Sequence, residues 1–288
     1  MQCPFSEPDY LQGLSHLGAV TPHRSGAAAV LSRAIPETPC LDGIGPWPYR
    51  WISDSAELEL FREGFRDLLT LTVVTQPGWL PPPESGDTRF LKHHYVYDPA
   101  RPVPQLSPRA RKRLQAAERI GQFEEIIVPA ERELMYGFYQ ELLQRRHLDQ
   151  GHFDMPREHF DAIGRLPGGR FFRVSNAQGI GAMACAIVIA DRLQVLHFVP
   201  TLSGLTWNAS YLLMHGLQDY AKRHGLLLLT GGMPDKGSAG LHTFKSRWSN
   251  STLPVHMICI VNDQRRYAEL LRNRIRRTSF FPAYRDGY

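Results

Sequence analysis

The chain has 288 residues, of which 43% are hydrophobic and 21% are charged. This is the balance of a folded globular protein, and the length suits two lobes better than one small core. The formal net charge of +5 is mild, and no apolar run approaches the ~18 residues that a membrane-spanning helix needs. The N-terminal sequence MQCPFSEPDY has no basic start followed by an apolar stretch, so we expect no secretion signal, no membrane span and a cytoplasmic location.

Residues 1–105 are rich in proline and glycine between short apolar segments. Proline lacks an amide donor, so the stretches 44–51 (IGPWPYRW) and 77–86 (PGWLPPPESG) cannot be helix interiors. Apolar residues at helical spacing predict a helix over 57–69, and β-branched residues predict strands over 69–75 and 89–97. We expect this part of the chain to form an α/β lobe with long loops.

Residues 106–288 have a more regular pattern. Ser107 and Pro108 suit the start of a helix and Gly121 its end, which predicts a helix over 107–121. The next predicted elements are, in chain order, a strand over 123–128, helices over 131–147 and 157–166, an antiparallel meander of strands over 170–175, 181–190 and 193–199, a loop over 200–207, a helix over 208–224 capped by Asn208, a strand over 226–230, a short helix over 240–248, a strand over 255–261 and a basic helix over 264–277.

Cysteine and histidine spacing indicates no metal site. The four cysteines include no CxxC pair, and the adjacent His93 and His94 have no further ligand close in sequence. Cys185 and Cys259 lie inside apolar runs, which predicts that they are buried as small hydrophobic residues. Reduced thiols agree with the expected cytoplasmic location.

Two motifs accompany this element order, which is that of a GNAT fold. The stretch 227–248 (LLLTGGMPDKGSAGLHTFKSRW) contains an apolar strand, a glycine pair, a variable loop, then Gly-Leu and Phe-Lys with an aromatic residue soon after. The stretch 107–126 (SPRARKRLQAAERIGQFEEI) is a basic helix that ends in glycine and enters a strand. The ordered set, over residues 105–262, resembles the Fem-type aminoacyltransferases and the BioF2-like acetyltransferases of the GNAT-like superfamily.

The resemblance implies an α/β (α+β) protein made of two GNAT-like lobes, with mixed, mostly antiparallel sheets flanked by helices. A divergent N-terminal lobe would occupy 1–105 and a complete acyltransferase lobe 106–288. The implied reaction is transfer of an acyl or aminoacyl group to an amine-bearing acceptor. No tightly bound cofactor is implied, because the donor is a substrate, either an acyl-CoA thioester or an aminoacyl-tRNA. The sequence shows no coiled-coil arm for tRNA, and since shorter relatives also lack it, both donors stay open.

Lys245 is the first candidate catalytic residue, because in relatives the lysine of the Phe-Lys pair lies at the reaction centre. A fixed ammonium can stabilise the oxyanion that develops during acyl transfer; the plainer alternative is a surface lysine. Gly231 and Gly232 would let a substrate approach the backbone, or they mark an ordinary exit from a strand. We expect Phe244 to bind substrate beside them.

His197 is the second candidate catalytic residue. Strand alternation predicts that it shares a side with Leu193, Val195 and Val199, and it would act as the general base or lie in the core as a hydrogen-bonded histidine. Three weaker candidates belong to the motif region: Asp235 and Arg247 would contact substrate or face water, and His242 lies one turn before the lysine.

The loop 201–208 (TLSGLTWN) lies where GNAT enzymes usually carry an Arg/Gln-x-x-Gly-x-Gly/Ala pattern that holds the pyrophosphate of coenzyme A. Only Gly204 of that pattern is present, and the loop has no basic residue, which speaks against ordinary acetyl-CoA binding. We expect Trp207 and Asn208 to line a donor groove, although Trp207 fits a packing role equally well. The segment 179–184 matches GxGxxA, but it opens a strand rather than a helix and is no dinucleotide site.

Two basic clusters, over 109–119 and 265–277, can attract phosphate-rich partners or form solvated helix faces. They keep a second interpretation open, in which the chain is a catalytically degenerate GNAT-like protein that binds RNA, tRNA included, through basic helices. The acceptor of the main hypothesis cannot be read from the sequence: peptidoglycan precursors, amino sugars and small amine metabolites all fit.

Overall fold

The computed structural model describes residues 3–26, 28–148, 153–232, 239–272 and 280–286, and the chain forms two compact units. Unit 1 contains Met1–Lys92 and Pro254–Tyr288, and unit 2 contains His93–Leu253. The chain passes between the units within two long strands, β5 (Asp87–Tyr97) and β11 (Ser251–Val261). This division differs from the predicted boundary after residue 105, because the C-terminal segment returns to unit 1, where β11 pairs with β4 (Thr70–Val74).

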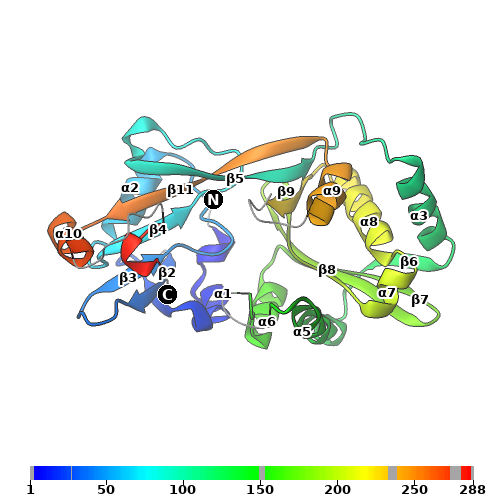
Figure 1. The fold of residues 1–288 in the computed structure, drawn as a ribbon, viewed down its shortest axis with the longest axis horizontal. Helices are drawn as coiled ribbons and strands as arrows, with labels where there is room; N and C mark the ends of the chain where they lie inside the picture. Colours follow the sequence, from blue (N-terminus) through cyan, green and yellow to red (C-terminus); the bar gives the residue numbers. More distant parts are fainter. Residues whose placement is uncertain (1–2, 27, 149–152, 233–238, 273–279, 287–288) are drawn as a thin grey trace. The chain divides into compact units, whose positions relative to one another are not determined.

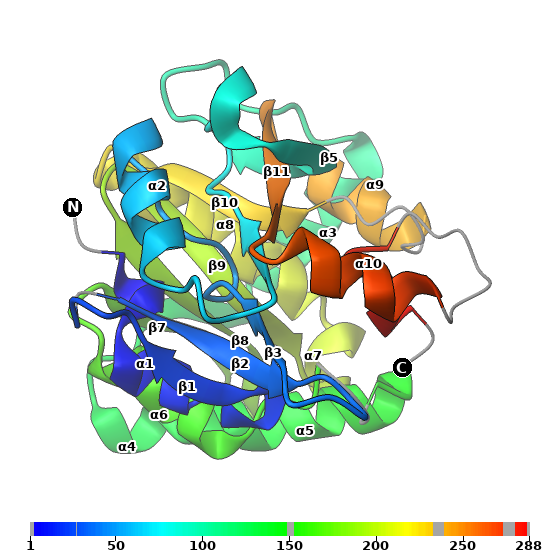
Figure 2. The ribbon, with the colours of Figure 1, turned by 90° about the vertical axis from the view of Figure 1, so that its left-hand side faces the viewer.

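Unit 1 is built on a mixed sheet in the order β1-β2-β3-β4-β11, in which only β3 and β4 are parallel. Figure 2 shows this unit with β1, β2 and β3 side by side. Besides β4, β5 and β11, its elements are η1 (Pro4–Ser6), α1 (Pro8–Gln12), η2 (Ser15–Leu17), β1 (Ala19–Pro22), β2 (Ala29–Ala34), β3 (Leu41–Ile44), α2 (Ser55–Glu63), η3 (Pro83–Ser85), α10 (Gln264–Arg272) and η4 (Ala283–Arg285). The prediction found α2, β4 and β5 but placed the end of α2 six residues too late.

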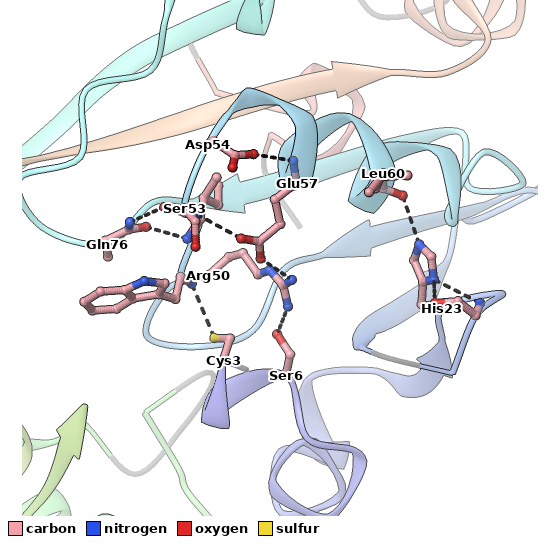
Figure 3. A network of polar contacts seen from close by, with 12 residues as sticks. Cys3, Ser6, His23, Arg50, Ser53, Asp54, Glu57, Leu60 and Gln76 are labelled. Carbon is pink, nitrogen blue, oxygen red and sulfur yellow. Dashed lines mark hydrogen bonds and ion pairs between the residues drawn. The ribbon is translucent and has the colours of Figure 1, made fainter. Parts of the chain in front are cut away.

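A polar network connects the N-terminal turn of unit 1 to the start of α2 (Figure 3). Arg50 is buried, and its guanidinium donates to the hydroxyl of Ser6 at 2.7 Å and to a carboxylate oxygen of Glu57 at 2.9 Å. The second oxygen of Glu57 accepts the amide of Ser53 at 2.9 Å, while Asp54 caps the helix by accepting the amide of Glu57. A buried cation needs such partners, so the network fixes the beginning of α2.

Unit 2 is built on a second mixed strand order, β5-β10-β9-β8-β7-β6, in which only β9 and β10 are parallel. Its elements are α3 (Pro108–Glu118), β6 (Gly121–Glu125), α4 (Pro129–Arg132), α5 (Leu134–Arg146), α6 (Arg157–Arg165), β7 (Gly169–Asn176), β8 (Gly179–Ile189), β9 (Arg192–Pro200), α7 (Leu202–Thr206), α8 (Ala209–Arg223), β10 (Leu227–Gly232) and α9 (Ala239–Arg247). The predicted order of helix, three-stranded meander, helix, strand, helix and strand is confirmed, and its last strand is β11. Helix α7 was not predicted.

Helices cover both faces of the unit 2 sheet (Figure 1). On one face, α8 packs on small residues of β8, among them Ala182, Ala184 and Ala186, and α3 packs against α8 and β6. On the other face, α5 and α6 contact β7, β8 and β9. Cys185 points to that second face and is fully buried; Cys259 in unit 1 is also buried, as predicted. Among the helices of the described residues, none has the length and hydropathy to cross a bilayer.

Two predicted helix starts have different outcomes. The side chain of Ser107 accepts the amide of Ala110, so it caps α3 as predicted. Asn208 stands before α8, but its backbone is left-handed, with φ +64°, and its side chain makes no capping hydrogen bond. The predicted cap is therefore wrong: the tight turn from α7 into α8 holds Asn208 in a conformation that asparagine tolerates better than most residues.

Candidate acyl-transfer site

The strands β9 and β10 separate partway along their length. Their parallel pairing covers Leu227–Leu229 against Arg192–Gln194, whereas β9 continues to Pro200. On its other edge β10 pairs with β5 from Leu228 onward, and this pairing continues to Gly232 after a shift of register beyond Leu229. At the point of separation, the buried side-chain amide of Gln194 donates to the carbonyl of Val195 at 2.8 Å. This bond satisfies a backbone acceptor beside the separation, so the fork has a polar apex that sequence periodicity did not reveal.

Both glycines of the motif lie on the β10 arm of this fork. Gly231 has φ +89°, a conformation that L side chains rarely adopt, and an added Cβ would lie 3.0 Å from Nζ of Lys245. Gly232 pairs with His94 of β5, and its carbonyl accepts a hydrogen bond from Nζ of Lys245 at 3.3 Å. At Gly231 the backbone angle therefore favours glycine, and an added side chain would press on the ammonium. The structure brings together the three residues that the sequence placed at the reaction centre.

Helix α9, which carries Lys245, is fixed to the core by aromatic residues. Phe244 packs against the core cluster, with its ring centroid 5.6 Å from that of Tyr211. Trp248, one residue after the helix, is buried at 1% exposure, and its carbonyl accepts the side-chain amide of Gln218 at 2.7 Å. Phe244 therefore acts here through packing, which holds the half-buried Lys245 in place.

A tyrosine and a histidine meet beside the lysine. Tyr95 of β5 is buried at 1% exposure, and its hydroxyl contacts Nδ1 of His242 on α9. Burial raises the pKa of Tyr95, so this hydroxyl stays protonated at neutral pH. The imidazole of His242 is exposed and precedes Lys245 by one helical turn. No sequence pattern pointed to Tyr95, because a buried strand tyrosine is common and only the pairing of β5 with β10 brings it here.

Arg247 is half-buried, and its partner among the described residues is a tyrosine. Its guanidinium donates to the hydroxyl of Tyr211 at 2.8 Å, and Arg113 of α3 donates to the same hydroxyl at 3.0 Å. Both cations also lie over the ring of Tyr211, at 5.9 and 5.7 Å from its centroid. Tyr211 consequently joins the basic helix α3 to the helix that carries Lys245.

His197 lies elsewhere, in a closed environment. A β-bulge between Cys185 and Ala186 shifts the pairing of β8 with β9, so that His197 lies opposite Cys185. The expectation that His197 shares a side with Leu193 and Val195 is therefore wrong, because strict alternation fails at a bulge.

The environment of His197 consists of rings from α5 and α6. Its Nε2 lies 3.0 Å from Nε2 of His159, and its ring centroid lies 4.9 Å from that of Tyr139 and 5.0 Å from that of Phe160. Burial lowers the pKa of His197 from 6.5 to about 3. This arrangement matches the alternative of a hydrogen-bonded core histidine.

The segment before α8 is occupied by packing. Gly204 lies so close to β8 that an added Cβ would meet the carbonyl oxygen of Gly181 at 1.8 Å, and the Trp207 ring fills the space over Gly121 and Gly181. Trp207 is 9% exposed and belongs to the core, in keeping with the packing role. Asn208 instead borders an open cavity of about 410 Å³.

Asp235 lies outside the described residues. Among the described residues, no group of three or more His, Cys, Asp or Glu side chains is arranged to hold a metal ion.

Comparisons with known proteins find similarity in structure rather than in sequence. No family model matches the chain, and no curated protein matches its sequence. FemX superposes with a TM-score of 0.61 at 10% identity, covering 92% of this chain and 94% of that one. L-PGS from Bacillus licheniformis gives a TM-score of 0.60 at 13% identity, covering 88% and 87%. The C-terminal domain (DUF2156) of a protein from Agrobacterium fabrum described as a lysylphosphatidylglycerol synthetase gives 0.60 at 14% identity, covering 93% and 91%.

These likenesses cover 94% of FemX and 91% of the Agrobacterium fabrum domain. At such low identity they establish the fold alone. The chain has the GNAT-like fold of the Fem-type aminoacyltransferases.

Proposed function

We propose that this chain is an N-acyltransferase that moves an acyl or aminoacyl group from an activated donor to an amine-bearing acceptor. The observation that carries the proposal is the ammonium of Lys245, which lies half-buried against the glycine pair of the β10 arm of a forked sheet. The fold of the neighbours supports a transferase of this kind, and one neighbour is named for a lysyl-carrying lipid.

The proposed reaction begins with attack of the acceptor nitrogen on the donor carbonyl. A carbon–nitrogen bond forms, and negative charge develops on the carbonyl oxygen. Lys245 stabilises this oxyanion, an effect of about 2.7–4 kcal/mol for comparable donors. The carbon–sulfur bond of a thioester, or the carbon–oxygen bond of an aminoacyl-tRNA, then breaks, and the leaving group takes up the proton that the amine releases. No bound metal or prosthetic group is needed in this scheme.

His242 is the better candidate for the proton acceptor. A general base must be reachable by substrate and works best with a pKa near the operating pH. His197 is enclosed by rings, with its pKa lowered to about 3, whereas the exposed His242 stands one turn from Lys245. In the tautomer whose Nδ1–H donates to the hydroxyl oxygen of Tyr95, this contact would orient the ring and leave Nε2 unprotonated and directed toward the acceptor amine.

The test is mass spectrometry of amine acceptors incubated with the purified chain and either an acyl-CoA mixture or charged tRNA. The proposal predicts an acceptor whose mass increases by one acyl or aminoacyl group, and Lys245→Met should lose this activity while its circular dichroism spectrum stays unchanged. Ribonuclease treatment separates the donors, because it abolishes only transfer from tRNA. Transfer that survives unchanged in Lys245→Met would contradict the proposed site.

The alternative of a degenerate RNA-binding protein depends on the two basic clusters, and they differ. In α10, Arg265 pairs with Glu269 at 3.2 Å and Arg266 with Asp263 at 3.4 Å, so the described part of that cluster is largely compensated. The cluster on α3 favours phosphate binding, and binding there without any acyl transfer would support this second function.

A further inference from the structure

The basic face of α3 borders a cavity in unit 2. Five residues of α3 at helical spacing line a space of about 410 Å³ together with the residue before α8. The lining residues are Pro108, Arg109, Lys112, Arg113, Ala116 and Asn208. The opposite face of α3, with Ala110, Leu114 and Ala117, packs in the core. This packing fixes the rotation of the helix and keeps its charged side chains at the cavity.

Within the described residues, no carboxylate compensates the positive charge of this cavity. For Arg109 and Lys112 no ion pair or side-chain hydrogen bond is formed within the part of the chain that the structure describes, and Arg113 donates to a neutral hydroxyl. By contrast, Arg173 on β7 of the same unit pairs with Glu124 at 2.8 Å and with Glu131 at 3.1 Å.

The carboxylate of α3 itself is engaged elsewhere. Glu118 lies 3.2 Å from Nδ1 of His215 on α8. In addition, neither α3 nor α8 has an acidic residue in its first turn, so the positive end of the α8 dipole adds to the same field. Several cations gathered on a cavity without a carboxylate are suited to an anionic ligand, and guanidinium groups match phosphate in particular.

We infer that this cavity binds the phosphate groups of the acyl donor. The inference rests on the proposed function and names the part of the donor that the chain holds. It also assigns to α3 the cationic contact that the loop over 201–208 lacks, since Gly204 and Trp207 there are occupied by packing. The two donors share the relevant chemistry, because coenzyme A and the 3′ end of tRNA both present an adenosine linked to phosphate.

The cavity is connected to the reaction site by direct contacts. Arg113 and Arg247 donate to the same hydroxyl of Tyr211, and the ring of Tyr211 touches Phe244, the neighbour of Lys245. A donor anchored by phosphate at α3 therefore has a continuous protein surface toward α9, along which its acyl end can extend.

A pair of matched variants tests the inference. Arg109→Gln removes a charge that lines the cavity, whereas Arg111→Gln removes another exposed charge of the same helix that does not line it. Binding is measured by titration calorimetry at several salt concentrations with two probes, coenzyme A and an RNA minihelix that ends in a tRNA acceptor sequence. We expect Arg109→Gln to weaken binding of one probe about tenfold, with a further loss in Arg109→Gln/Lys112→Gln, and Arg111→Gln to leave it within about twofold.

The probe that responds identifies the donor. A response to coenzyme A alone supports a thioester, and a response to the minihelix, with a salt slope reduced by about 1 in Arg109→Gln, supports tRNA. Equal weakening by Arg109→Gln and Arg111→Gln, or no binding of either probe to the unsubstituted chain, overturns the inference. Transfer activity tests the proposed function separately. Binding that depends on Arg109 without any acyl transfer would contradict the proposed acyltransferase function but support phosphate binding at the cavity. Transfer without such binding would support the function and contradict the role of the cavity.

Discussion

Two histidine-bearing regions of unit 2 lie on opposite faces of its sheet and differ in burial and in the side chains around them. The closed histidine pair, His159 and His197, is enclosed by rings from α5 and α6 and forms an Nε2–Nε2 contact of 3.0 Å. The open site around His242 and Lys245 lies on α9, beside the glycine pair, with its imidazole exposed. The comparison teaches that a histidine inside a strand pattern is ambiguous until burial is known, because burial determines whether its proton can be exchanged with a substrate.

The largest change between the two regions is expected in the rate of transfer, at the open site. His242→Gln should lower kcat by on the order of 10²-fold, because a positioned proton acceptor is lost. Tyr95→Phe should cause a smaller loss, since the imidazole stays and only its orienting hydroxyl is removed. Rate measurements against pH check both, and unchanged rates in His242→Gln would remove this residue from the mechanism.

At the closed pair the expected effect is on stability. The pKa of His197 falls from 6.5 to about 3 on folding, so between these values the unfolded chain binds more protons at this side chain. The contribution of His197 to stability is complete above pH 6.5 and is lost as the pH falls toward 3, by up to about 1.4 kcal/mol per pH unit. Urea midpoints at pH 7 and pH 5 should differ less in His197→Gln than in the unsubstituted chain; equal pH dependence would contradict the closed environment.

Two matched glycine variants separate the effect of backbone strain on stability from an effect on transfer activity. Gly231→Ala places a side chain at φ +89° and 3.0 Å from Nζ of Lys245, whereas Gly179→Ala places one at φ +123° at the first residue of β8, with open space around it. Each should lose about 1–2 kcal/mol of stability. Only Gly231→Ala should also lower transfer activity, because only there is the ammonium displaced. Equal activities would show that Lys245 does not depend on the bare backbone of Gly231.

The smallest effect is expected at Tyr211. Tyr211→Phe keeps the ring contacts but removes the hydroxyl that accepts from Arg113 and Arg247, at a cost of about 1 kcal/mol in thermal stability. A loss of several kcal/mol would mean that this hydroxyl organises the core rather than the surface between α3 and α9.

The sequence predicted the element order of unit 2 well, because its strands alternate and a glycine such as Gly225 follows the C-cap of a helix directly, although α3 ends at Glu118, before the predicted stop at Gly121. It also placed Gly231, Gly232 and Lys245 together through their motif. Three features escaped it for physical reasons. The bulge at Cys185 shifts His197 to the other face without any local signal, and the short strands β1–β3 lack enough residues to show a period.

The third feature is long-range pairing. Tyr95 meets His242, 147 residues away in the sequence, only because β5 lies beside β10, and Gln194 is a polar residue whose role exists only where two strands separate. The return of the C-terminal segment to unit 1 has the same origin, since the partner of β11 in that unit is β4. Local patterns cannot specify such contacts.

The most direct test compares Lys245→Met and His197→Gln in one transfer assay with the same donor and acceptor, at pH 7, where both chains are folded. We predict that Lys245→Met lowers kcat/KM by about 10²–10³ and that His197→Gln keeps a rate within a few-fold of the unsubstituted chain. The opposite ranking, with His197→Gln inactive and Lys245→Met active, would contradict the assignment of the reaction to the α9 face of the forked sheet.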